Sequence, residues 1–280
     1  MRSISPLLFP GLPALFALAA PGSLMIATAS ADDHGSPIEF QAKKLLGEAF
    51  QNRYGADMTA TIDLILRNTN GQERVRRFRA ASKRIEGRTH TIGRLVWPEY
   101  LRGMTILTIE AHERSHDAFI YLPSLQKVRR INTSQRGDAF LGSDVTYEDL
   151  ERRRVDEYEV VSLEVTERGE PAWTIGAKPI EDFTYERVDF VVAAADYAIL
   201  ESRYFKRGSE DPFRIITTDR SDMVEQQGHV LPTRMFVRNS MRGTSTEVVF
   251  RDLIVGAPID DKLFSVSTLE RRRSLPGESR

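Results

Sequence analysis

Two histidines and a glutamate stand in an arrangement typical of zinc proteases. His112-Glu113-Arg114-Ser115-His116 matches the pattern H-E-x-x-H. That pattern binds zinc when a helix brings both histidines to one face, with the glutamate beside the metal-bound water. Here it lies between two strand-like segments, 105–109 and 118–122. We therefore interpret it as a hairpin tip, where the histidines need not converge, and predict no metal site.

Other patterns of catalytic residues are absent from the sequence. It contains no G-x-S-x-G, no G-x-x-x-x-G-K and no G-x-G-x-x-G that would open a helix. It also contains no cysteine, which excludes disulfides, thiolate metal ligands and a cysteine nucleophile. The acidic residues are scattered along alternating segments and indicate solvent-exposed strand faces. We predict neither an enzyme nor a bound cofactor.

Composition narrows the class of protein further. The 280 residues include 39 Lys and Arg against 40 Asp and Glu, with 41% hydrophobic residues. A chain with this hydrophobic content and almost no net charge is expected to fold rather than remain disordered. The absence of a basic excess gives no support for a nucleic-acid partner.

The first 31 residues have the pattern of a secretory signal. Arg2 is their only charged residue, an apolar run follows at 7–20, and Ala29-Ser30-Ala31 places small residues before Asp32. Prolines interrupt the apolar run well short of the ~20 residues that a membrane-spanning helix needs. We expect cleavage after residue 31 and export to the periplasm.

The mature chain combines one helix with many strands. After a polar linker at 32–37, apolar residues at helical spacing predict a helix over 38–54. Asn70-Gly71 indicates a hairpin between strands 58–66 and 74–84. Short strand candidates separated by polar turns then recur at 92–97, 104–110, 118–122, 127–131, 158–167, 172–179, 187–192, 199–205, 213–219, 230–238 and 246–255.

These elements predict a mainly β fold with a few helices. Strands at this spacing are typical of an antiparallel sheet, barrel or sandwich. A loop at 132–154 interrupts them and contains a short helix at 147–154. We expect one domain over 38–268 and a polar, solvated tail over 269–280.

Two adjacent motifs resemble those of a known family. Residues 119–131 read FIYLPSLQKVRRI, and residues 140–150 read FLGSDVTYEDL. This pair resembles the outer-membrane lipoprotein-sorting protein family, a LolA-like group. Trp97-Pro98 and the IDDKLF stretch at 259–264 also fit the group, so that the resemblance covers about 38–266.

The resemblance implies both a fold and a function. The implied fold is LolA/LolB-like: a strongly curved antiparallel sheet, or half-open barrel, that covers helices and encloses an apolar cavity. The implied function is that of a periplasmic carrier of lipid or lipidated protein, which binds acyl chains and works with an inner-membrane transporter of the resistance-nodulation-division (RND) type. Contact with membranes would be transient.

Two sets of residues are candidates for this site. The residues of the first set would line the cavity or, alternatively, belong to an ordinary core, because strand alternation alone does not say which face is concave. This set consists of Trp97, Met104, Ile106, Phe119, Tyr121, Phe140 and Leu141. The residues of the second set would hold the FLGSD loop onto the sheet: Arg129, Arg130, Gly142, Asp144, Tyr147 and Asp149. We expect Asp144 or Asp149 to pair with Arg129 or Arg130, and Gly142 to have a positive φ.

Two other functions stay open at this stage. The protein would be an accessory subunit that docks on such a transporter and carries nothing if its core is filled and a large apolar patch is exposed. It would be a secreted zinc hydrolase only if His112, Glu113 and His116 converge on a metal.

Overall fold

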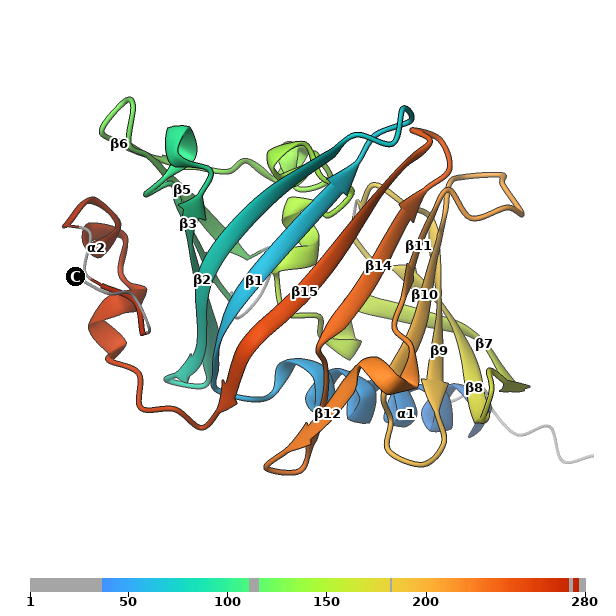
Figure 1. Cartoon of the computed structure of the whole chain (residues 1–280). Coiled ribbons are helices and arrows are strands. Elements are labelled where there is room, and N and C mark those ends of the chain that lie inside the picture. The colour runs from blue at the N-terminus through green and yellow to red at the C-terminus, as the bar shows by residue number, and fades with distance from the viewer. Residues whose placement is uncertain (1–36, 111–115, 182, 272–273, 277–280) are drawn as a thin grey trace, which may run out of the picture. The chain divides into compact units, whose positions relative to one another are not determined.

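A computed structural model describes residues 37–110, 116–181, 183–271 and 274–276 (Figure 1). The predicted signal sequence and its cleavage site lie outside these residues, as do His112 and Glu113. None of the helices in the described ranges has the length and apolarity needed to cross a membrane.

One antiparallel sheet of 13 strands dominates the fold. Its strands lie in the order β6-β5-β4-β3-β2-β1-β15-β14-β11-β10-β9-β8-β7. They span Met58–Arg67 (β1), Glu73–Ile85 (β2), Arg88–Trp97 (β3), Thr105–Ile109 (β4), Asp117–Leu122 (β5), Lys127–Arg130 (β6), Tyr158–Glu167 (β7), Pro171–Pro179 (β8), Arg187–Ala193 (β9), Ile199–Phe205 (β10), Arg214–Thr217 (β11), Arg234–Asn239 (β14) and Thr244–Val255 (β15). A separate hairpin pairs β12 (Met223–Gln226) with β13 (His229–Pro232).

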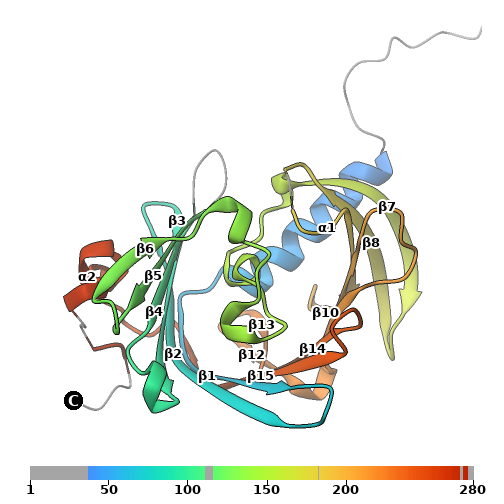
Figure 2. The same ribbon diagram turned by 90° about the horizontal axis from the view of Figure 1, so that it is seen from above.

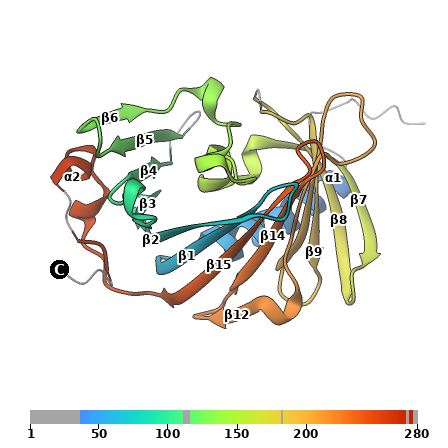
Figure 3. The same cartoon turned by 45° about the horizontal axis from the view of Figure 1, so that its top comes forward.

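The chain builds this sheet from two halves that meet at its centre. Strands β1 to β6 run outward to one edge, and β7 to β11, β14 and β15 return from the other edge until β15 pairs with β1. Register shifts interrupt four strand pairs, β1–β15, β2–β3, β7–β8 and β9–β10. Such irregularities bend and twist strands, and the sheet curves into a trough that does not close (Figure 3). The predicted mainly β, half-open fold is confirmed.

The predicted hairpin at Asn70-Gly71 is present with a longer turn than the dipeptide suggested. Arg67 pairs with Glu73, so that five residues connect β1 to β2. The Asn68 side-chain oxygen accepts hydrogen bonds from the backbone N–H groups of Asn70 and Gln72 at 3.0 and 2.9 Å. Gly71 supplies the positive φ of 75° that this turn requires.

Helix α1 (Pro37–Tyr54) packs against one end of the trough. Its buried side chains recur at helical spacing and form one stripe: Ala42, Leu45, Leu46, Ala49 and Phe50. Phe50 meets Phe190 of β9 edge to face, with ring centroids 5.3 Å apart. Burial of this stripe explains why the segment forms a helix next to so many strands.

A long connection joins the two edges of the sheet across its concave side. Residues 131–157, which we call the crossover segment, run from β6 to β7 and occupy the trough (Figure 2). They contain only short 3-10 turns, including Tyr147–Leu150 where a helix over 147–154 was predicted. Because β6 and β7 are opposite edges, this connection has to be long.

The C-terminal segment covers the other face of β3, β4 and β5. A 3-10 turn (Asp261–Phe264) leads into α2 (Val266–Arg271). Leu269 and Leu275 are buried in a cluster with Leu107 and Tyr121. The predicted solvated tail over 269–280 is therefore wrong at both leucines, because this face of the sheet is apolar and takes them as its cover.

Candidate functional site

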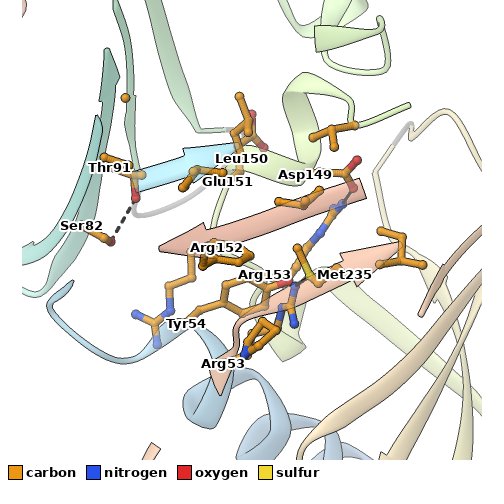
Figure 4. A pocket seen from close by; sticks show the side chains of 18 of the residues that line it. Arg53, Tyr54, Ser82, Thr91, Asp149, Leu150, Glu151, Arg152, Arg153 and Met235 are labelled. Carbon is orange, nitrogen blue, oxygen red and sulfur yellow. Dashed lines mark hydrogen bonds and ion pairs between the residues drawn. The ribbon is translucent and has the colours of Figure 1, made fainter. Parts of the chain in front are cut away.

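A cavity of about 230 Å³ lies between the concave face of the sheet, the end of α1 and the crossover segment (Figure 4). Most of its wall is apolar, and the strands at the centre of the sheet contribute mainly alternate residues. These include Ile62 and Leu64 of β1, Phe78 and Ala80 of β2, Gly93 of β3, Ile106 of β4, Ile216 of β11, Met235 and Val237 of β14, and Val248 and Phe250 of β15.

Strand register aligns these side chains into one continuous surface. Ile62 stands between Phe78 on β2 and Phe250 on β15. Val248 is paired with Leu64 on one side and with Met235 on the other. Paired residues of neighbouring strands project to the same face. The apolar wall is therefore a consequence of register across the centre of the sheet.

The crossover segment closes the cavity from the side opposite the sheet. Phe140, Val145 and Leu150 line it, and Phe140 packs on Phe78 with ring centroids 5.4 Å apart. Tyr147 meets Phe140 edge to face at 5.4 Å, and burial raises the pKa of its hydroxyl. The motif FLGSDVTYEDL thus supplies much of the cover.

Five of the seven predicted cavity residues lie in or near the cavity wall or at the end of β3. Ile106 and Phe140 line the cavity. Met104 and Leu141 are partly buried against the same apolar cluster, whereas Trp97 is 53% exposed at the end of β3. Whether any of them contacts a ligand stays a prediction.

Phe119 and Tyr121 do not line this cavity, and the register of β5 explains the correction. Phe119 pairs with Leu107, and both pack on the opposite face of the sheet under the C-terminal segment. Tyr121, two residues further along β5, projects to the same face as Phe119 and is buried in the same cluster. Ile120 is the β5 residue opposite Ile106. A strand over 118–122 has two faces, and its sequence does not say which one is concave.

Several cavity residues were not singled out from the sequence. Met235, Val237, Val248 and Phe250 lie in strands that were predicted, at alternate positions, so the signal was present. They could have been found only with the knowledge that β14 and β15 sit at the centre of the sheet beside β1.

The FLGSD loop is held by other partners than the predicted ones. Asp144 accepts hydrogen bonds from the hydroxyls of Thr244 and Thr246, at 2.5 and 2.9 Å. Gly142 has a φ of 77°, as predicted. Arg129 and Arg130 are exposed, and Arg130 pairs with Asp117. They lie on edge strand β6, whereas the loop has already crossed to the centre of the sheet.

Asp149 anchors the next turn of the segment. Its carboxylate accepts two hydrogen bonds from the buried Arg214 of β11, at 2.6 and 3.1 Å. Burial alone would raise the pKa of Asp149, but Arg214 and Arg153 outweigh it and the pKa is lowered. Burial raises the pKa of the neighbouring Glu148 carboxyl. The predicted pairing of Asp144 or Asp149 with Arg129 or Arg130 is wrong.

His116, the last residue of the zinc-like pattern, is buried and not at an exposed tip. Its side chain is 3% exposed, and its Nδ1 lies 3.6 Å from a Glu151 oxygen. Burial and the nearby Arg136 lower the pKa of His116 to about 4, so its ring is neutral at neutral pH. The described residues contain no group of three or more potential metal ligands.

Comparison with known proteins places the chain in a family. A family model described as "Uncharacterized protein" matches residues 87–271, more than half of the chain. The chain belongs to this family. No curated protein matches the sequence.

Solved structures share the fold of this family member. A putative outer-membrane lipoprotein-sorting protein domain from Vibrio parahaemolyticus aligns with a TM-score of 0.76 and 22% identity, over 83% of this chain and 100% of that one. A DUF1329 family protein from Desulfovibrio piger gives 0.75 and 21%, over 83% and 99%. A LolA superfamily protein from Nitrosomonas europaea gives 0.64 and 18%, over 81% and 98%. The LolA-like fold expected from the sequence motifs is confirmed.

Proposed function

We propose that this protein is a periplasmic carrier that binds the acyl chains of a lipid or lipidated protein in its cavity. The observation that carries the proposal is the apolar cavity, walled by the centre of the sheet and covered by the crossover segment. The LolA-like fold supports a carrier role. The protein would act by binding and release, without a catalytic group.

The physical chemistry of the wall suits an acyl chain. Burial of methylene groups contributes ~0.8 kcal/mol per CH₂, so a chain of fatty-acid length can bind without any polar contact. An apolar cavity also lowers stability, because the side chains around it lose packing partners. Ile62, Phe78 and Phe250 would regain those partners when an acyl chain fills the space between them.

Location and partner complete the proposal. Export would follow from the signal pattern that ends at Ala31, and intact-mass analysis of exported protein should find a mature start at or near Asp32. A product that retains Met1 would contradict export with cleavage. The cargo would be exchanged with an inner-membrane transporter of the RND type.

A variant that fills the cavity tests the binding proposal. A Cβ atom at Gly93 would stand 3.5 Å from Ile106 and 3.9 Å from Phe78, which is ordinary contact. The rest of a leucine in Gly93→Leu would therefore extend into the cavity. Gly47→Leu is the matched control, since a Cβ there meets only Val155, at 3.9 Å.

The measurement is titration of delipidated protein with a fluorescent acyl probe, followed by displacement with native lipid extract. We expect saturable binding by the native protein and by Gly47→Leu, and loss of binding in Gly93→Leu. Absence of binding by well-folded native protein would overturn the carrier proposal and favour a docking subunit.

A further inference from the structure

One side of the cavity is lined by arginines. Arg53 comes from the last turn of α1, and Arg152 and Arg153 come from the crossover segment. Arg152 donates a hydrogen bond to the Gln51 side chain at 3.0 Å, which ties it to the end of α1 that carries Arg53. Figure 4 shows the three arginines around the space that the apolar side chains enclose.

The two carboxylates of the cavity lining are already occupied by arginines outside it. Asp149 receives two hydrogen bonds from Arg214. Glu151 receives two from Arg136. Neither Arg214 nor Arg136 belongs to the lining. Of the three lining arginines, Arg152 lies 3.4 Å from a Glu110 oxygen and Arg153 lies 3.6 Å from an Asp149 oxygen, so the acidic residues compensate the positive charge on this side only in part.

Donor atoms of these arginines lack acceptors. Arg152 Nε and Arg153 Nη2 are buried and have no hydrogen-bond partner within the part of the chain that the structure describes. The Arg153 side chain is only 4% exposed, and its nearest carboxylate oxygen, on Asp149, is 3.6 Å away. Buried donors without acceptors are rare in folded proteins and call for a missing partner.

Arg53 also lacks a strong hydrogen-bond acceptor. Its Nη2 contacts the sulfur of Met235 at 2.6 Å, and its guanidinium lies 5.5 Å from the centre of the Tyr54 ring. A thioether is a weak acceptor. No ion pair joins Arg53 to a carboxylate in the described ranges. A half-buried guanidinium in this setting can still accept an anionic partner.

We infer that the cavity takes an acyl ligand with an anionic head group, a carboxylate or phosphate whose oxygens face Arg53, Arg152 and Arg153. This inference rests on the proposed carrier function and narrows its substrate class. Anionic oxygens would supply acceptors to the unmatched donors with charge-assisted hydrogen bonds. The chain would extend along Ile62 and Phe250. An uncharged ligand of the same length, such as an alcohol, would offer those donors only a weaker, neutral acceptor.

Matched ligands test the head group independently of the chain. Palmitate, hexadecyl phosphate and hexadecanol share a chain of sixteen carbons and differ in charge. In displacement of a neutral fluorescent acyl probe, we expect the two anions to bind at least about tenfold more tightly than the alcohol. Inorganic phosphate, which has no chain, should not displace palmitate.

Arginine variants then assign the preference to this side of the cavity. Arg53→Gln and Arg152→Gln should each weaken palmitate binding several-fold and leave hexadecanol binding unchanged. Arg207→Gln is the control, since this side chain is 94% exposed and outside the lining. Thermal unfolding verifies that both cavity variants fold, and Arg53 is half-exposed and tolerant of change.

The outcomes separate the two proposals. Equal affinity for hexadecanol and palmitate overturns the head-group inference and leaves the carrier intact. An anionic preference that survives both variants, or displacement by inorganic phosphate at similar concentration, also overturns it. Binding of no acyl ligand by folded protein overturns the carrier proposal itself.

Discussion

Arg214 of β11 and Asp149 of the crossover segment form a buried, two-point ion pair across 65 residues of sequence. Arg214 is 2% exposed and Asp149 accepts from both of its terminal nitrogens, at 2.6 and 3.1 Å. The pair fixes the segment that covers the cavity to the returning half of the sheet. The shape of the cavity thus depends on a contact between charged groups as well as on apolar packing.

The first prediction concerns this pair. Asp149→Asn removes the hydrogen-bonded counter-ion of the buried Arg214 and leaves only the Glu148 carboxyl, 4.0 Å away. It should lower the free energy of unfolding by about 3–5 kcal/mol. Urea denaturation measures the change. The control is Glu73→Gln, which removes the exposed ion pair with Arg67 and should cost at most about 1 kcal/mol. Equal losses in the two variants would show that the buried pair does not anchor the segment.

The second prediction concerns pH and His116. Its pKa is about 4 in the folded protein against 6.5 for an unperturbed histidine, because burial disfavours the charged ring. Between these values the unfolded chain binds the extra proton, so the free energy of unfolding should fall as pH drops from about 6.5 to about 4. The full effect is of the order of 3 kcal/mol.

The neutral variant His116→Gln isolates this contribution. Burial raises the pKa values of Glu151 and Glu157, so their protonation has the opposite effect on stability as pH falls. Both carboxyls remain in the variant, and the difference between native and variant unfolding curves reports the histidine. A difference that does not change between pH 4 and pH 6.5 would contradict the buried, neutral histidine.

The third prediction concerns the C-terminal segment. Leu269 is fully buried against the face of β3, β4 and β5 opposite the cavity. Leu269→Ala should lower the free energy of unfolding by about 2–5 kcal/mol, since it leaves a hole in a packed cluster. Leu125→Ala, at a side chain that is 48% exposed, is the control and should cost within about 1 kcal/mol. If Leu269→Ala left the free energy of unfolding almost unchanged, the result would favour a solvated tail.

Local pattern was enough to predict most of the secondary structure. Strands over 158–167 and 199–205 agree with the structure at both ends, because alternation of apolar and polar residues is a property of a few neighbouring residues. The helix at α1 follows from an apolar stripe in the same way. The short strand β12 (Met223–Gln226) was missed.

The local sequence pattern could not predict which face of each strand lines the cavity. Ile106 and Phe119 both lie in short apolar strands with apolar neighbours, yet one lines the cavity and the other packs under the C-terminal segment. A shift of one residue in register exchanges the two faces of a strand. Only the pairing of β4 with β5 decides which face of the sheet Phe119 joins.

The sequence by itself determined the strands, the first helix, the absence of cysteine chemistry and the motifs of a LolA-like fold. Tertiary structure decided which partners the charged groups of the crossover segment take. Arg129 and Arg130 are near Asp144 in sequence, but Asp144 bonds Thr244 and Thr246. Periodicity is a short-range property, whereas a buried charge pairs with whichever group the folded sheet brings close to it. The arginine-lined side of the cavity, assembled from α1 and a segment about a hundred residues later, arises for the same reason.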